Sequence, residues 1–258
     1  MPNVFIAGID SELGGLIGDH LEALGWSVYG TTRRPESVSD SIFYLEAEDL
    51  NSIEESVVTF LNKTSDWDLV IIAIGMLNPI GKLTEINFDL WRASIEINFV
   101  NQIYLLKTLL EYSTPVGKKK RKILTFAGSG TNSAPINFSA YTISKIALIK
   151  STEILAAEFP NYVFLSVGTG WMKSRIHNQT LEAGTQAGEA YVETKKRLAN
   201  DNFGKPSLLL DFIDWYLKCD NENISGRNIA LQGDDWKAQD FISSLTSSID
   251  SYKLRKMT

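Results

Sequence analysis

Cysteine and surplus positive charge are both scarce in this sequence. Cys219 is the single cysteine among 258 residues, so no disulfide can form within the chain, and a reducing, cytoplasmic location is favoured over secretion. Lysine and arginine number 25 against 31 aspartates and glutamates, which gives a formal net charge of -6. Because nucleic acids are bound through an excess of cationic side chains on one face, we expect no nucleic-acid partner.

Long hydrophobic runs are missing as well. The longest candidate, Leu69 to Leu77, is too short to cross a bilayer and is typical of a buried strand. The first seven residues have neither the basic start nor the long apolar core of a secretory signal. We therefore expect no membrane partner, and a hydrophobic content of 44% fits a single domain over residues 1–258 with one large core.

Short apolar runs alternate with helical patterns along the chain, as in the βαβ units of a parallel sheet. The sequence therefore predicts an α/β fold, a doubly wound, Rossmann-like parallel sheet of about seven strands with helices on both faces. The predicted strands are Val4–Ala7, Ser27–Thr31, Ile42–Leu45, Leu69–Ile74, Lys122–Ala127, Tyr162–Val167 and Arg227–Leu231. The predicted helices are Leu13–Leu24, Leu50–Leu61, Phe88–Tyr112, Ala140–Phe159 and Pro206–Lys218.

Two polar segments interrupt this alternation. Residues from about Lys173 to Phe203 have no strand pattern, and we expect a mobile helical segment there that serves as a substrate lid. Lys118–Lys122 is a run of five basic residues before an apolar stretch. This run favours a solvated loop at the sheet edge over an anion-binding patch.

Glycines follow the first predicted strand, where a fold of this type binds a dinucleotide. Gly8 comes directly after the strand, and Gly15 and Gly18 lie in the helix that follows. Glycines between a strand and a helix let the backbone approach a pyrophosphate, whose charge is stabilised by free N–H groups and the helix dipole. We predict that these three glycines bind the cofactor. The alternative is that they only permit tight packing of the helix on the strand.

Arg33 and Arg34 follow the second predicted strand, and no acidic residue is present at the end of that strand. An acidic side chain at this position binds the ribose hydroxyls of NAD, whereas Arg33 or Arg34 would pair with the 2′-phosphate of NADP. We therefore expect NADP as the cofactor, with NAD as the alternative. Asp49, after the third strand, is expected either to bind the adenine or to cap the helix that begins at Leu50.

Tyr141 and Lys145 are four residues apart, which places them on one face of a helix. Tyr191 and Lys195 have the same spacing but lie in the polar segment, and we predict that they are surface residues. Tyr141 instead opens the helix after the fifth strand, where a doubly wound sheet presents side chains to its cofactor cleft. Hydride transfer to a carbonyl carbon needs a proton at the oxygen, and a nearby ammonium lowers the pKa of a tyrosine that moves this proton.

Taken in order, these features resemble the short-chain dehydrogenase/reductase family from Val4 to about Ser174. The matching features are the glycine-rich turn, Asp49, Asn98, the Tyr141-x-x-x-Lys145 pair and Gly170 after the sixth strand. The resemblance implies that Tyr141 is the catalytic proton donor or acceptor, with Lys145 lowering its pKa and binding the nicotinamide ribose. It implies that Asn98 is a helix-bend residue that holds a water in a proton relay, and that Gly170 lets the backbone approach the nicotinamide. It also implies a homodimer or homotetramer packed through the two long helices.

Three departures from the family's pattern are present. The family's turn, Thr-Gly-x-x-x-Gly-x-Gly, is expected to be more compact than the loop after Gly8 here. The family's Asn-Asn-Ala-Gly motif appears here as Ile72-Ala73-Ile74-Gly75, which loses the asparagines but keeps Gly75, and we expect this glycine beside the cofactor. The catalytic serine falls on Gly128, so we expect Ser129 to polarise the substrate carbonyl in its place. The alternative is that Ser129 belongs only to a flexible turn.

The sequence thus predicts an enzyme, an NADP(H)-dependent oxidoreductase that interconverts a small-molecule carbonyl and its alcohol without a metal. One alternative is a dinucleotide-binding regulatory or scaffold protein with the same fold and little catalysis. Another is a sugar-nucleotide epimerase or dehydratase, since those enzymes share the tyrosine–lysine pair. About 85 residues follow Gly170, fewer than the separate substrate domain of such epimerases usually needs.

Overall fold

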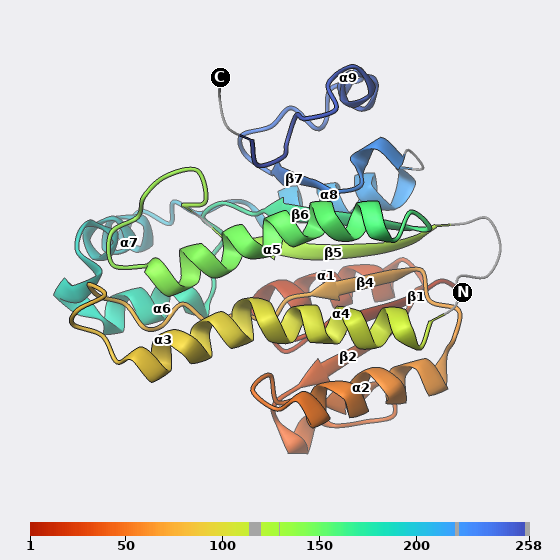
Figure 1. Ribbon diagram of the computed structural model, residues 1–258, viewed down its shortest axis with the longest axis horizontal. Helices are drawn as coiled ribbons and strands as arrows, with labels where there is room; N and C mark the ends of the chain where they lie inside the picture. The colour runs from red at the N-terminus through yellow and green to blue at the C-terminus, as the bar shows by residue number, and fades with distance from the viewer. Residues whose placement is uncertain (114–119, 129, 220–221, 256–258) are drawn as a thin grey trace.

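The computed structural model describes residues 1–113, 120–128, 130–219 and 222–255, and at its centre is a seven-stranded sheet (Figure 1). The strand order is β3-β2-β1-β4-β5-β6-β7, and every neighbouring pair is parallel. The predicted doubly wound parallel sheet is therefore confirmed. The strands are β1 Asn3–Ala7, β2 Ser27–Thr32, β3 Ile42–Tyr44, β4 Leu69–Ile72, β5 Arg121–Ala127, β6 Tyr162–Gly168 and β7 Arg227–Ala230.

Helices cover both faces of this sheet. They are α1 Glu12–Ala23, α2 Leu50–Lys63, α3 Phe88–Ile95, α4 Asn101–Glu111, α5 Ser139–Glu158, α6 Arg175–Glu182, α7 Glu189–Ala199, α8 Pro206–Lys218 and α9 Phe241–Ser247. Successive side chains of a strand point to opposite faces. Val4 and Ile6 of β1 therefore pack with α1 and α8, whereas Phe5 and Ala7 pack with α2 and α4. In the described ranges no helix is long and apolar enough to span a membrane.

The polar segment after β6 contains α6 and α7. They lie at the left of Figure 1, near the end of the sheet where α5 begins. Because all strands are parallel and α5 follows β5, this end holds the carboxyl ends of the strands. Parallel α/β sheets bind their ligands at the carboxyl ends of the strands.

The prediction of one continuous helix over Phe88–Tyr112 is wrong in its middle. Helix α3 ends at Ile95, and Glu96–Val100 forms a π-helical segment before α4 begins. Asn98 lies in this segment and is fully buried. A π segment inserts one residue per turn and shifts the direction of the side chains that follow, and such segments are frequent at functional sites. Apolar spacing in the sequence continues across the insertion, so the pattern did not reveal it.

The predicted solvated loop over Lys118–Lys122 is wrong at its C-terminal end, while its first two residues lie outside the described ones. Arg121 and Lys122 are buried in β5. Lys122 Nζ donates a hydrogen bond of 2.6 Å to the carbonyl oxygen of Tyr216 in the last turn of α8. Arg121 packs over the ring of Trp67. Carbonyl groups at a helix C-terminus carry partial negative charge, so they stabilise an ammonium even when it is buried.

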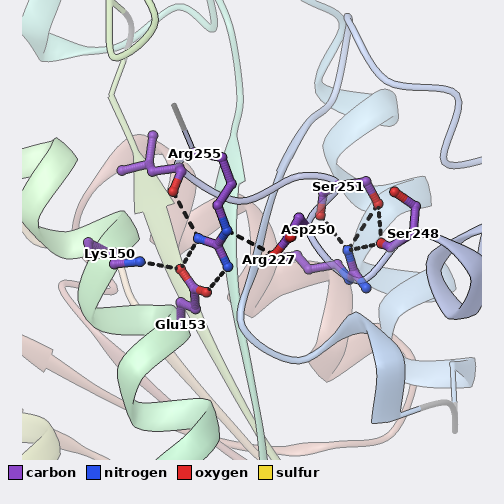
Figure 2. Close-up of polar contacts among 8 residues, drawn as sticks. Lys150, Glu153, Arg227, Ser248, Asp250, Ser251 and Arg255 are labelled. Carbon is purple, nitrogen blue, oxygen red and sulfur yellow. Dashed lines mark hydrogen bonds and ion pairs between the residues drawn. The ribbon is translucent and has the colours of Figure 1, made fainter. Parts of the chain in front are cut away.

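A buried arginine, Arg227 of β7, holds the segment that follows the last strand. Its side chain is 3% exposed. The guanidinium donates to the carbonyl oxygens of Asn223 at 2.6 Å, Leu245 at 2.9 Å, Ser248 at 3.3 Å and Ser251. Figure 2 shows Arg227 together with two of these partners, Ser248 and Ser251. A guanidinium has five N–H donors, so one side chain supplies partners to several backbone groups at once.

Arg255 makes a second, more exposed link between the same segment and α5 (Figure 2). Its guanidinium donates to both carboxylate oxygens of Glu153 and to Asp250 at 2.9 Å. Lys150 also pairs with Glu153 at 2.7 Å. The hydrogen bond from Arg255, assisted by the one from Lys150, holds the pKa of Glu153 down to about 2.

Replacing Arg227 with methionine should lower the free energy of unfolding by about 3 kcal/mol or more, because four backbone carbonyl groups lose their donor. Arg255→Met is the matched control and should cost less, since Arg255 is exposed and its carboxylate partners remain accessible to water. Urea unfolding followed by circular dichroism measures both variants. Equal losses in the two would contradict a greater role for the buried arginine.

Candidate active site

A pocket of about 420 Å³ opens at the carboxyl ends of the strands. Its walls come from the turn after β1, the segments after β4, β5 and β6, the first half of α5, and the helices α6 and α7. The residues that line it include Ser11, Glu12, Leu13, Arg33, Gly75, Tyr141, Thr142, Lys145, Gly170, Trp171, Met172 and Arg175. The pocket therefore collects residues from most of the motifs that the sequence singles out.

The turn after β1 is compact. Gly8 has a φ of +85°, which glycine adopts without strain, and its N–H donates to Thr31 Oγ1 at 2.9 Å. Helix α1 begins at Glu12 with Ser11 as its cap, whose Oγ accepts the N–H of Gly14 at 3.0 Å. The N–H groups of Glu12 and the next residue have no hydrogen-bond partner in the described part of the chain. They give this turn the free donors that an anion needs.

The expectation of a longer loop in this turn is wrong. Ala7 to Gly14 has the same length as the family's Thr-Gly-x-x-x-Gly-x-Gly, with Ala7 replacing the threonine and Glu12 replacing the second glycine. Gly14, which the sequence analysis did not single out, is the residue at which α1 comes closest to the backbone of the turn. A Cβ on Gly14 would lie 2.3 Å from the carbonyl oxygen of Gly8, so no other residue fits there without a backbone shift.

Gly15 and Gly18 face away from the pocket walls. A Cβ on Gly15 would lie 3.3 Å from the carbonyl oxygen of Ile9, and one on Gly18 would lie 3.2 Å from the Ile9 side chain. Neither lines the pocket. Their geometry matches the packing alternative, because Ile9 fills the space between α1 and β2, where it also faces Gly30.

The two arginines after β2 have different surroundings. Arg34 Nε lies 3.4 Å from Asp10 Oδ2, which also accepts the hydroxyl of Thr32 at 3.2 Å. Arg33 lines the pocket and forms no ion pair within the described residues. Asp10 belongs to the turn after β1, so a pattern confined to β2 did not reveal this carboxylate.

Asp49 caps α2. Its Oδ1 accepts the N–H of Asn51 at 2.9 Å, and Asp49 is exposed and does not line the pocket. This geometry matches the capping alternative. Asn and Asp are preferred at helix N-termini for this hydrogen bond.

Tyr141 and Lys145 lie together in the pocket wall and are 8% and 4% exposed. Lys145 Nζ lies 5.8 Å from the centroid of the Tyr141 ring, and it has no hydrogen-bond partner in the described residues. Burial raises the pKa of Tyr141 to about 12 and lowers the pKa of Lys145 to about 8. Both shifts favour the uncharged forms, which is the effect of desolvation.

The second pair with the same spacing behaves differently. Lys195 Nζ donates directly to the Tyr191 hydroxyl at 3.1 Å, Lys195 is exposed, and neither residue lines the pocket. The two pairs thus share a sequence pattern and differ in their environment. Only the pair on α5 combines burial with access to the pocket.

Asn98 and Gly75 lie behind the Tyr141–Lys145 pair. Asn98 Oδ1 accepts the N–H of Met76 at 2.9 Å, and its Nδ2 donates to the Met76 carbonyl at 2.7 Å. A Cβ on Gly75 would lie 3.1 Å from Asn98 Oδ1 and 3.7 Å from Lys145 Nζ. Gly75 therefore occupies a position where a side chain would come between the amide and the ammonium.

Gly128 occupies the position where the family has its serine, and the space around it is filled. A Cβ there would lie 2.6 Å from Cε1 of Tyr141 and 2.8 Å from Cγ of Lys145. Glycine at this position thus lets the Tyr141 ring approach the end of β5. Ser129 lies outside the described residues.

Gly170 follows β6 and lines the pocket with a φ of +67°. The indole of the next residue, Trp171, stacks on His177 at 5.2 Å between ring centroids, and the guanidinium carbon of Arg197 lies 4.5 Å from the indole. His177 is half-buried, and its Nε2 donates to the carbonyl of Met172 at 2.8 Å. These contacts join the segment after β6 to α6 and α7.

Two functional candidates were missed by the sequence analysis. Glu12 and Arg175 both line the pocket, and Arg175 Nε lies 3.4 Å from Glu12 Oε1. They are 163 residues apart, so local spacing carries no signal for their contact. The only sequence clue was the match of Glu12 to the second glycine of the family's turn.

A family model described as enoyl-(acyl carrier protein) reductase matches residues 29–230, which is most of the chain. Oxidoreductase BOA17 of Botryotinia fuckeliana is 24% identical over 229 residues, covering 81% of this chain and 82% of that protein. An uncharacterized oxidoreductase of Schizosaccharomyces pombe is 26% identical over 132 residues, covering 51% of this chain. That match spans about half, 52%, of the S. pombe protein.

Solved structures share the fold. The KRED1-Pglu enzyme has a TM-score of 0.78 at 21% identity, covering 88% of this chain and 100% of its own. The short-chain dehydrogenase/reductase YIR035C of Saccharomyces cerevisiae has a TM-score of 0.77 at 18% identity, covering 92% and 98%. An actinorhodin polyketide ketoreductase determined with NADPH has a TM-score of 0.75 at 17% identity, covering 89% and 95%.

The family model covers most of the chain, the curated relatives are oxidoreductases, and the solved structures share the fold. This chain belongs to the short-chain dehydrogenase/reductase family of oxidoreductases.

Proposed function

We propose that this protein is an NADP(H)-dependent enzyme that interconverts a small-molecule carbonyl and its alcohol, with Tyr141 and Lys145 as its acid–base pair. The observation that carries the proposal is the Lys145 ammonium, which lines the pocket beside Tyr141 while buried and without a partner in the described residues. Lowering the pKa of a lysine from 10.5 to about 8 corresponds to a cost of about 3 kcal/mol. A ligand with hydrogen-bond acceptors offsets this cost.

The residues around the turn after β1 fit a dinucleotide. The free N–H groups at the start of α1 and the close approach permitted by Gly14 suit a pyrophosphate. Arg33 faces the pocket at the end of β2 and suits a 2′-phosphate. Gly75 and Gly170 leave the backbone accessible on the nicotinamide side of the pocket. When bound, the nicotinamide supplies the hydride for reduction or takes it up in oxidation.

Tyr141 is the proposed proton donor in reduction. Its raised pKa keeps the phenol protonated at neutral pH, which is the form that gives a proton to a carbonyl oxygen. The nearby Lys145 ammonium then stabilises the phenolate that remains, and it donates to ribose hydroxyls. Asn98 has one further acceptor site on Oδ1, beside Gly75, for the water that returns a proton. Ser129 is the proposed donor to the substrate oxygen.

Helices α4 and α5 are the proposed contact in a homodimer or homotetramer. Val100, directly before α4, and Ile143 and Ile154 of α5 are 46%, 50% and 47% exposed. Exposed apolar side chains on adjacent helices are typical of a subunit interface. The helices α6 and α7 are the proposed substrate lid.

One observation favours a binding protein with little catalysis. Gly128 at the family's serine position leaves no room for a side chain, because Tyr141 and Lys145 fill the space. A second observation favours NAD over NADP. The carboxylate of Asp10 lies beside Thr32 at the end of β2, where an acidic group suits ribose hydroxyls.

Tyr141→Phe should reduce carbonyl reductase activity at least about 100-fold, because it removes the proton donor and leaves the ring. Tyr191→Phe is the matched control and should keep activity near the wild-type value. The assay follows NADPH oxidation across a panel of aldehydes and ketones. Tight NADPH binding without any Tyr141-dependent turnover would instead support the regulatory protein.

Arg33→Ala should raise the Kd for NADPH about tenfold or more and leave the Kd for NADH nearly unchanged, because it removes the partner of the 2′-phosphate. Arg34→Ala is the matched control, since Arg34 pairs with Asp10. Isothermal titration calorimetry measures both affinities. A wild-type protein that prefers NADH would contradict the NADP assignment.

Lys145→Met should stabilise the fold at pH 7 by about 1 to 3 kcal/mol while abolishing activity, because a buried charge is replaced by an apolar chain of similar length. Between the folded pKa of about 8 and the unfolded pKa of 10.5, the unfolded state binds more protons. Wild-type stability therefore rises with pH in this window, and the advantage of the variant shrinks. Urea unfolding from about pH 7 to about pH 9.5 tests this, with Lys195→Met as the control. A pH-independent difference would exclude Lys145 as its source.

A further inference from the structure

Arg175, the first residue of α6, connects the proposed lid to the turn after β1. Its Nη2 donates to the carbonyl oxygen of Asp10 at 3.1 Å, and its Nε lies 3.4 Å from Glu12 Oε1. Arg175 and Glu12 both line the pocket, and their side chains are 52% and 43% exposed. A cation from one wall of the pocket thus meets an anion at the start of α1.

The carboxylate of Glu12 is an obstacle to a dinucleotide at this position. It belongs to the first turn of α1, beside the N–H groups that have no partner in the described residues and that suit a pyrophosphate. Two like charges in one site repel each other. The family's compact turn has a glycine in place of Glu12. In this chain, the negative charge of the Glu12 carboxylate must therefore be offset before a pyrophosphate can bind.

We propose that Arg175 binds the cofactor pyrophosphate and neutralises Glu12. This inference rests on the proposed function, because it concerns the dinucleotide site of the same pocket. A guanidinium has five N–H donors, and the contacts with Asp10 and Glu12 use only two of them. The remaining donors serve phosphate oxygens in the bidentate geometry that arginine favours.

The position of Arg175 also couples the proposed lid to cofactor binding. Helix α6 contacts the glycine turn through this side chain, and its Gln179 Oε1 accepts the N–H of Leu77 at 2.8 Å on the other side of the pocket. A pyrophosphate that binds Arg175 therefore strengthens the attachment of α6 to the turn. Binding of the dinucleotide and ordering of the substrate pocket are coupled in this way.

The test is a double-mutant cycle with Arg175→Met, Glu12→Gln and the two combined, measured as Kd for NADPH and NADH by isothermal titration calorimetry. Arg175→Met should raise both Kd values by about tenfold or more, because both dinucleotides carry the pyrophosphate. Arg33→Ala, in contrast, is expected to affect NADPH alone. Lys173→Met is the matched control, since Lys173 is an exposed cation near α6 that does not line the pocket.

The direction in which Glu12→Gln changes the dinucleotide Kd distinguishes pyrophosphate binding by Arg175 from a purely structural link between α6 and the turn. If Arg175 offsets the charge of Glu12, adding Glu12→Gln to Arg175→Met should lower the Kd again by at least about threefold. If the pair only fastens the lid, Glu12→Gln alone weakens binding as much as Arg175→Met does, and the proposal is overturned. An unchanged Kd in Arg175→Met, or a double variant no better than Arg175→Met, overturns it too. Wild-type protein that binds neither dinucleotide would instead refute the proposed function.

Discussion

The burial of one ammonium group, that of Lys145, is the constraint around which the pocket is arranged. Desolvation lowers its pKa to about 8, a cost of about 3 kcal/mol that no described residue offsets through a hydrogen bond. The neighbours of Lys145 explain how it stays accessible. Gly75 and Gly128 both lack the Cβ that would crowd it, and Asn98 lies just beyond Gly75. The buried ammonium lowers the stability of the fold, and a polar ligand that binds it offsets this cost.

Local irregularities of the backbone lie where they shape this pocket. The π-helical segment between α3 and α4 contains Asn98, and its buried amide holds the backbone of Met76 through two hydrogen bonds. Gly8 and Gly170 adopt positive φ at the ends of β1 and β6. These three departures from regular structure occur at the carboxyl edge of the sheet. The regular parts of the strands and helices, by contrast, serve the two cores on either face.

Charge around the turn after β1 is balanced by contacts between distant segments. Asp10 pairs with Arg34, which follows β2, and Glu12 pairs with Arg175 from α6. These pairs leave Arg33 as the cation that faces the pocket at the end of β2. The sequence favoured NADP because of Arg33 and Arg34, but the fold brings the carboxylate of Asp10 to the same place. An arginine favours the 2′-phosphate of NADP, whereas the carboxylate of Asp10 suits the hydroxyls of NAD.

The sequence by itself determined the doubly wound sheet, because alternating apolar periods specify strands and helices locally and parallel connections leave few topologies. It also placed Tyr141 at the start of α5 and distinguished it from Tyr191 by its position after a strand. Only the tertiary structure decided which glycines pack, that Arg121 and Lys122 are buried, and that Glu12 meets Arg175. Those outcomes depend on side-chain directions and on contacts between segments far apart in the chain. Local sequence patterns specify neither of these.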